Sequence, residues 1–261
     1  MSKDYLGFRA KIGVLVPFTN TIVQPEFELL KPRGVTNHTA RIPNRKRPTH
    51  SDEAYAEAMK EGAVGTEDVI DRLLPLEPNL IILGHSIDSF AGGVEGAKIF
   101  EKKLSEHAAS CPVIIPSLAM NEALNKLGIC EKSKVSIITP YLPSGGKQAM
   151  DFFEDSGFKV VSHINLSCKT ALEIAAVTKS QIKNSIEQVN TPEVEAIVQV
   201  GTNLPFQYYA PIAEKELSKP VLSINTATYW YSIRSLGIND QMNGFGDLFK
   251  YYWDCSLFSL M

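Results

Sequence analysis

Short apolar runs, each followed by a polar residue or a proline, recur along this chain. The runs are rich in Val and Ile and roughly five to seven residues long, which is typical of buried β-strands. Several of the intervening segments open with Ser, Thr or acidic residues, as helices do. We expect strands over residues 11–17, 35–42, 79–86, 112–116, 134–140, 195–202 and 220–223, and helices over 25–30, 66–74, 94–107 and from Ser117 to Gly128, with a further helix opened by residues 51–53. Strands that alternate with helices predict an α/β fold with mostly parallel sheets.

The second half of the chain repeats the plan of the first. The matched strands are 11–17 with 134–140, 79–86 with 195–202, and 112–115 with 220–223. The offsets of 123, 116 and 108 residues drift slowly, as differences in loop length would produce. Three matched strands in the same order predict a duplicated α/β unit.

A duplicated unit predicts two pseudo-symmetric lobes, each a mostly parallel sheet flanked by helices, with the active site in the cleft between them. We expect lobe 1 to contain residues 1–120 and 225–261, and lobe 2 to contain residues 121–224. Helix N-termini and loop N–H groups beyond the strand ends favour anions. A small carboxylate is therefore the expected ligand.

Composition narrows the function classes. Hydrophobic residues make up 44% and charged residues 21%, as in ordinary globular proteins. The net charge of −3 gives no reason to expect a nucleic acid or a membrane surface as partner. The apolar runs are too short to span a bilayer, and the first residues lead into no apolar signal segment, so we expect a cytoplasmic protein.

No pattern for a metal or an organic cofactor is present. The four cysteines, Cys111, Cys130, Cys168 and Cys255, are scattered without a CxxC pair, so we expect free thiols and no zinc site. Neither a G-x-G-x-x-G after the first strand nor a P-loop occurs. Cys168 has a polar context and is either a loop residue or a functional thiol. The basic segment at residues 43–48 is either a solvated loop or a lid that attracts an anionic substrate.

Side chains that can carry chemistry gather at the predicted strand ends. His85 follows one strand and can act as acid, base or anion donor, with Asp88 three residues on to orient it and Ser86 to donate to an oxyanion. Alternatively, His85 and Asp88 only tie down their loop. The predicted catalytic residues are His85, Ser86, Asp88 and Tyr141, and the predicted substrate-binding residues are Pro17, Asn20, Gly84, Gly201, Thr202 and Asn203.

The remaining candidates also have two interpretations. Asn20 can bind a carboxylate or cap a helix, and Tyr141 can donate a hydrogen bond or cover a sheet edge. Gly201 lets a ligand approach the backbone, where the N–H groups of the following turn, at Thr202 and Asn203, can cradle an oxyanion.

Nearly the whole chain resembles the aspartate/glutamate racemase superfamily, and most of all its branch of maleate isomerases and arylmalonate decarboxylases. The segments that carry the resemblance are 13–21, 84–86, 139–141, 157–161, 225–230, 236–238 and 244–246. The resemblance implies two Rossmann-like lobes, a cofactor-independent enzyme that acts on a small carboxylate, and a possible homodimer.

Two positions depart from that branch. The resemblance implies one thiol at the end of each equivalent strand in the racemases and maleate isomerases, and only the second thiol in the arylmalonate decarboxylases. In this chain the two positions fall at about Gly84 and His85, and at Gly201, and neither holds a cysteine. The asparagine of the maleate isomerases has Ala171 near its place. Thiol chemistry is therefore not expected, and His85 is expected to transfer the proton instead. The sequence favours a decarboxylase-like lyase with an enolate intermediate, with a His85-dependent hydrolase or hydratase and a non-catalytic carboxylate-binding protein as alternatives.

Overall fold

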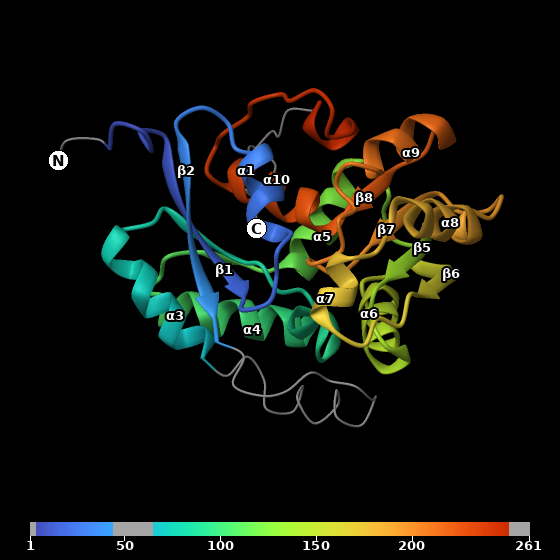
Figure 1. Ribbon diagram of the computed structural model, residues 1–261, viewed down its shortest axis with the longest axis horizontal. Helices are drawn as coiled ribbons and strands as arrows, with labels where there is room; N and C mark the ends of the chain where they lie inside the picture. The colour runs from blue at the N-terminus through green and yellow to red at the C-terminus, as the bar shows by residue number, and fades with distance from the viewer. Residues whose placement is uncertain (1–3, 44–64, 251–261) are drawn as a thin grey trace.

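Two four-stranded parallel sheets form the framework of the protein. The computed structural model describes residues 4–43 and 65–250. The sheets have strand orders β2-β1-β3-β4 and β6-β5-β7-β8. The strands are β1 (Ala10–Pro17), β2 (Val35–Ile42), β3 (Leu80–Leu83), β4 (Val113–Ile114), β5 (Lys134–Thr139), β6 (Lys159–Asn165), β7 (Ala196–Gln199) and β8 (Val221–Ser223). This confirms the predicted fold class, and Figure 1 shows β1 and β2 on the left of the view and the second sheet on the right.

Helices cover these sheets. The α-helices are α1 (Val23–Leu29), α3 (Thr66–Leu73), α4 (Gly93–His107), α5 (Pro116–Lys126), α6 (Pro143–Asp155), α7 (Ala171–Ala175), α8 (Lys179–Val189), α9 (Ala210–Leu217) and α10 (Ile224–Ser235). The described residues also form short 3-10 helices at η1 (Leu74–Leu76), η2 (Ile87–Phe90) and η3 (Asp247–Phe249). The central strands β3 and β7 are fully buried. A strand that is covered on both faces must be apolar throughout, which is why these two read as continuous apolar runs.

The internal repeat is visible in the strand registers. In the first sheet Ile12 pairs with Leu80, and in the second Val135 pairs with Ala196. Each residue of the second pair stands where the predicted offset places it. The outer pairs follow the same rule, since Ile81 pairs with Val113 and Ile197 pairs with Val221. The two sheets are therefore two copies of one plan.

The region around β4 differs from the prediction. The strand covers only Val113 and Ile114, because α5 already begins at Pro116, where a fixed φ suits the first helical position. Ser117 does not cap this helix. Its hydroxyl instead donates to the carbonyl oxygen of Ser89 at 2.6 Å.

The last helix returns to the first half of the molecule. α10 packs against α5 and α1, and Phe27 and Tyr229 place their ring centroids 5.0 Å apart. Because α5 packs with α4 and α10, we propose that lobe 1 extends beyond residue 120 to the end of α5, and that residues 225–250 belong to it. The predicted helix opened by residues 51–53 and most of the basic segment at 43–48 lie outside the described residues.

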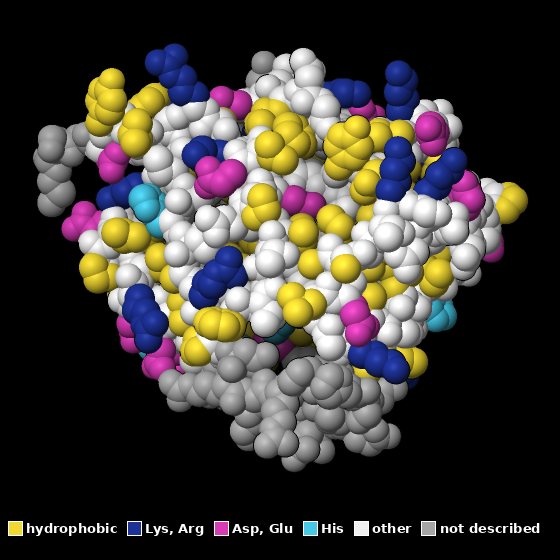
Figure 2. Space-filling model, in the orientation of Figure 1, with side chains coloured by type: hydrophobic (Ala, Val, Ile, Leu, Met, Phe, Trp, Pro, Cys, Tyr) yellow, Lys and Arg dark blue, Asp and Glu magenta, His cyan; other side chains and the backbone are white. Residues whose placement is uncertain are grey.

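The described part of the molecule carries no broad field of one charge on the face drawn in Figure 2, where Lys and Arg alternate with Asp and Glu. Within the described ranges, no helix has the length and apolar character needed to cross a membrane. No group of three or more His, Cys, Asp or Glu side chains in these ranges is placed to hold a metal ion.

Candidate active site

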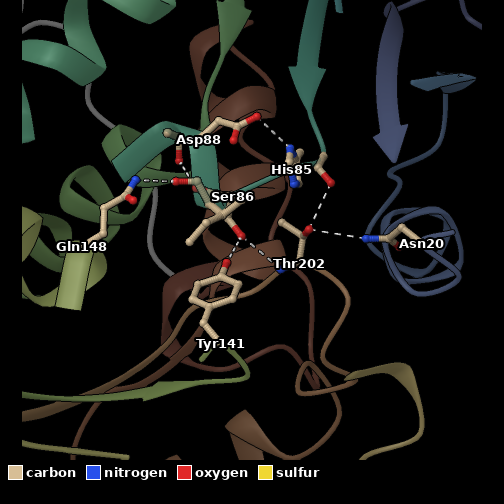
Figure 3. Close-up of polar contacts among 10 residues, drawn as sticks. Asn20, His85, Ser86, Asp88, Tyr141, Gln148 and Thr202 are labelled. Carbon is tan, nitrogen blue, oxygen red and sulfur yellow. Dashed lines mark hydrogen bonds and ion pairs between the residues drawn. The ribbon is translucent and has the colours of Figure 1, made fainter. Parts of the chain in front are cut away.

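The carboxyl ends of β1, β3, β5 and β7 meet where the two sheets face each other. Figure 3 shows the side chains that follow these strands pointing toward one another. The centre is Ser86, just after β3, whose Oγ lies 2.7 Å from the hydroxyl oxygen of Tyr141, just after β5. The backbone N–H of Thr202, after β7, donates to the same Ser86 oxygen at 3.2 Å. The structure thus brings three predicted site residues from both halves into one cluster.

Thr202 is held by further contacts across the lobes. Its hydroxyl donates to the carbonyl oxygen of Gly84 at 3.0 Å, and it accepts from Asn20 Nδ2 at 3.4 Å. Asn20 Oδ1 accepts from the N–H groups of Ile22 and Val23, where α1 begins. Asn20 therefore fixes the turn that leads into α1, and its amide nitrogen also reaches the site.

His85 and Asp88 form an ion pair beside this cluster, with 3.1 Å between His85 Nδ1 and Asp88 Oδ2. The His85 side chain is 34% exposed, so its ring remains accessible. Burial lowers the pKa of His85, but the charge of Asp88 and its hydrogen bond raise that pKa by more, so the net pKa lies above the ordinary value. The ring therefore carries a proton to higher pH than a free histidine does.

Tyr141 is a neutral hydroxyl donor or acceptor in this setting. Burial raises the pKa of its phenol well above the ordinary range, an effect that the hydrogen bond with Ser86 only partly offsets. The backbone N–H of Tyr141 donates to Thr139 Oγ1 at 3.0 Å, which fixes the turn after β5. Gln148, on α6, donates to the carbonyl oxygen of Ile87 at 3.1 Å and ties the η2 turn to the second lobe.

The strand-end positions at which the resemblance places thiols are held by Gly84 and His85 after β3 and by Gly201 after β7. A Cβ on Gly84 would lie 2.7 Å from the carbonyl oxygen of Leu15. Gly201 has a φ of +105°, and a Cβ there would clash with the ring of Pro140. A side chain at either position needs the neighbouring backbone or ring to move. The neighbours of Gly84 and Gly201 therefore leave room for glycine and for no larger residue in the present packing.

Asn203 has a different environment from the one expected of a substrate-binding residue. Its Oδ1 accepts from the N–H of Thr21 at 3.0 Å, and its Nδ2 donates to the carbonyl oxygen of Ala171 at 2.6 Å. Both polar ends are thus engaged by the protein, and Asn203 ties the β1–α1 loop to α7. Pro17 ends β1, and its carbonyl oxygen accepts from Arg41, which also binds the carbonyl oxygen of Asn20 at 2.8 Å.

Cys168 is half-buried in the loop after β6. Burial and the charge of Glu173 both raise the pKa of its thiol, the burial effect being the larger. A raised thiol pKa disfavours the reactive thiolate. This environment fits a loop residue better than a functional thiol.

Sequence reasoning missed two buried residues behind the site. Glu26 lies on the apolar face of α1, with Val23 and Phe27, and Asn225 lies in the first turn of α10. Glu26 could have been found from the sequence, because it is an acidic residue at a position of the helix that otherwise holds apolar residues. No comparable signal marked Asn225.

Comparisons with known proteins agree with this fold. Residues 65–249 match the family model described as arylmalonate decarboxylase. A maleate isomerase from Alcaligenes faecalis is 22% identical over 248 residues, which cover 91% of this chain and 95% of that protein. A mutant maleate cis-trans isomerase from Nocardia farcinica, solved with a covalently bound succinylcysteine intermediate, has a TM-score of 0.80 at 23% identity, covering 92% of this chain and 98% of its own. An arylmalonate decarboxylase structure has a TM-score of 0.67 at 18% identity, covering 92% of this chain and 98% of its own.

Proposed function

Because this chain belongs to the arylmalonate decarboxylase family of enzymes, within the predicted aspartate/glutamate racemase superfamily, we propose that it acts without a cofactor on a small carboxylate. We propose further that it is a lyase, which removes CO₂ from a substrate with two carboxylates on one carbon. The observation that carries this proposal is the His85–Asp88 ion pair beside the cluster of Ser86, Tyr141 and the Thr202 N–H.

The hydroxyl cluster provides for an oxyanion. Ser86 Oγ accepts from the Thr202 N–H, and a single hydrogen bond joins Ser86 to Tyr141. Whichever hydroxyl donates in that bond, one of the two hydroxyl hydrogens is left for a third oxygen. We assign that hydrogen to the enolate oxygen that forms as CO₂ leaves, which it would stabilise as an oxyanion donor.

His85 then supplies the proton. The bond between the carbon and the departing carboxylate breaks, and its electron pair passes into the enolate of the remaining carboxylate. The enolate carbon takes the proton of His85 Nε2, and the neutral imidazole regains a proton from solvent. The sum is substrate plus one proton giving CO₂ and a monocarboxylate. Asp88, paired with Nδ1, orients the ring and stabilises its charged form.

A thiol route has less support in this chain. The Nocardia farcinica relative was solved with a succinylcysteine intermediate, and its isomerisation of maleate is the rival reaction in the family. The resemblance places the thiols at about Gly84 and His85 and at Gly201, and none of these is a cysteine. Neither Gly84 nor Gly201 accommodates a Cβ without movement of its neighbours.

A hydrolase or hydratase, with His85 as the base that activates water, is the second candidate. The raised pKa of His85 argues against it, because it increases the protonated share of the ring, and only the neutral ring can act as the base. A non-catalytic carboxylate-binding protein is the third. The cytoplasmic location and the homodimer stay predictions.

One experiment separates these functions. Purified protein is incubated with aryl- and alkylmalonates, with maleate and with unsaturated carboxylates, and the products are analysed by mass. The proposal expects loss of CO₂ from a malonate. It also expects His85→Ala to abolish turnover, while circular dichroism shows an intact fold. Gain of water supports the hydratase, and conversion of maleate without a change of mass supports the isomerase. Saturable binding with no turnover supports the non-catalytic protein. Full activity of His85→Ala would exclude the proposed role of that residue.

A further inference from the structure

A carboxyl group that the proposed mechanism does not use lies buried behind the site. Glu26, on α1, is 8% exposed. Burial raises its pKa to about 8, although hydrogen bonds from Asn225 and from the Gln207 N–H act in the opposite direction. Near neutral pH most of the carboxyl is therefore protonated. An uncharged carboxyl in this position is a hydrogen-bonding group rather than an ion-pair partner.

Glu26 determines the orientation of the Asn225 amide. Asn225 Nδ2 donates to Glu26 Oε2 at 2.6 Å and to the carbonyl oxygen of Thr202 at 2.9 Å. These two bonds use both hydrogens of the amide nitrogen. If the amide were turned over, its oxygen would face the carbonyl oxygen of Thr202, which has no hydrogen to donate. Asn225 Oδ1 is buried with no hydrogen-bond partner in the described part of the chain, so the two bonds from the nitrogen set the orientation.

All three polar atoms of Thr202 are thereby held. Its N–H donates to Ser86, and its hydroxyl binds the Gly84 carbonyl oxygen and Asn20. Its carbonyl oxygen is held by Asn225. Two sets of hydrogen bonds thus link α1 to Thr202. One runs through Asn20, just before the helix, and the other through Glu26 on its buried face and Asn225.

We propose that Glu26 and Asn225 are positioning residues for the site, which hold the Thr202 turn so that its N–H stays directed at Ser86 Oγ. Neither residue touches the reacting atoms. Loss of the Glu26 oxygen releases the Asn225 amide, the Thr202 turn gains freedom, and the hydrogen bond to Ser86 lengthens or breaks. This inference rests on the proposed function only for its kinetic consequence.

The test compares two substitutions of the same residue. Glu26→Gln retains an uncharged oxygen for Asn225, while Glu26→Leu fills a similar volume without an acceptor. Glu28→Gln, an exposed site on the same helix, is the control. We expect Glu26→Leu to lower kcat about 10²-fold with little change in KM, because a slightly misplaced group acts in the transition state. We expect Glu26→Gln to restore most of that loss.

A second readout needs no turnover. Amide hydrogen exchange of Thr202, measured by NMR on the full chain, is expected to quicken in Glu26→Leu and to stay slow in Glu26→Gln and Glu28→Gln. If Glu26→Leu does not fold, Asn225→Ala removes the same link and is read in the same way. Unchanged Thr202 exchange in a folded Glu26→Leu or Asn225→Ala protein overturns the inference. Failure of the proposed function, by contrast, is seen in the products and in His85→Ala, and leaves the exchange experiment valid.

Discussion

The N–H of Thr202 donates to the hydroxyl oxygen of Ser86, 116 positions earlier in the chain, at 3.2 Å. The same 116 residues separate the equivalent strands β3 and β7, so the two residues are counterparts in the internal repeat. Each stands just past the end of an inner strand of its own sheet, Ser86 after β3 and Thr202 after β7. The two copies of the unit therefore meet through equivalent residues, and the candidate site is centred on that meeting point.

This contact predicts what the two hydroxyl groups contribute. Tyr141→Phe removes the phenol oxygen and leaves Ser86 with the Thr202 N–H, whereas Ser86→Ala removes the oxygen that both neighbours use. We expect each variant to lower kcat by about 10²- to 10³-fold, as loss of an oxyanion donor does. Tyr231→Phe, which removes a phenol outside the cluster, is the matched control. Steady-state kinetics on a malonate substrate measures the effect, and unimpaired kcat in Ser86→Ala would contradict the assigned role.

The His85–Asp88 pair predicts a pH dependence. Asp88 raises the pKa of His85 above its unfolded value, so the stability that the pair contributes is fully present below that unfolded pKa and is lost as pH rises through the folded pKa. Activity that needs the protonated ring falls over the same range. In Asp88→Asn, burial still lowers the pKa of His85, but the carboxylate charge that raised this pKa is gone. The loss of activity with rising pH is therefore expected to begin at lower pH.

The matching control is a second His–Asp pair. His107 Nε2 lies 3.0 Å from Asp71, away from the candidate site. Asp71→Asn should leave the pH profile of kcat unchanged. An NMR titration of the His85 ring locates its pKa directly, and an unchanged ring pKa in Asp88→Asn would refute the prediction.

From the packing around Gly201 we predict that any side chain at this position lowers the free energy of unfolding. Gly201 and Gly128 both have positive φ, +105° and +79°, but only Gly201 has a neighbour in the way of a Cβ, at Pro140. We expect Gly128→Ala to lower the free energy of unfolding by about 1–2 kcal/mol, from backbone strain alone. Gly201→Ala is expected to cost about 1–3 kcal/mol more, because the added methyl overpacks the turn. Denaturant unfolding measures both, and equal losses would show that Pro140 moves aside freely.

From the two hydrogen bonds of Asn203 we predict that this residue stabilises the fold and does not contact the ligand. Asn203→Ala leaves the Thr21 N–H and the Ala171 carbonyl oxygen without their partner. Two lost hydrogen bonds at about 0.5–1.5 kcal/mol each should lower the free energy of unfolding. Calorimetry detects this as a lower Tm. Carboxylate affinity that falls while Tm stays constant would instead indicate direct contact with the ligand.

The strand and helix order could be predicted because it depends on local patterns. The runs at β1, β3, β5 and β7 are apolar since both faces of these strands are covered, and their polar ends mark the edge where the site lies. The registers confirm the repeat that those runs predicted. The cap of α5 was misplaced by two residues, at Ser117 instead of Ile115. Serine is a common capping residue, but the fixed φ of Pro116 suits the first helical position, so the helix begins there.

The sequence by itself determined the α/β class, the duplication and the strand ends at which the candidate residues gather. These features depend on hydrophobic periodicity, which is a property of residues close together in the chain. Only the tertiary structure decided the partner of each side chain. It brought Asn225 within hydrogen-bond distance of Glu26, 199 positions earlier, and placed Pro140 against Gly201. It also gave Asn203 its two partners, the Thr21 N–H and the Ala171 carbonyl oxygen. Hydrogen bonds and steric contacts depend on the distance and direction between atoms of remote segments, and these are set when the two lobes pack together.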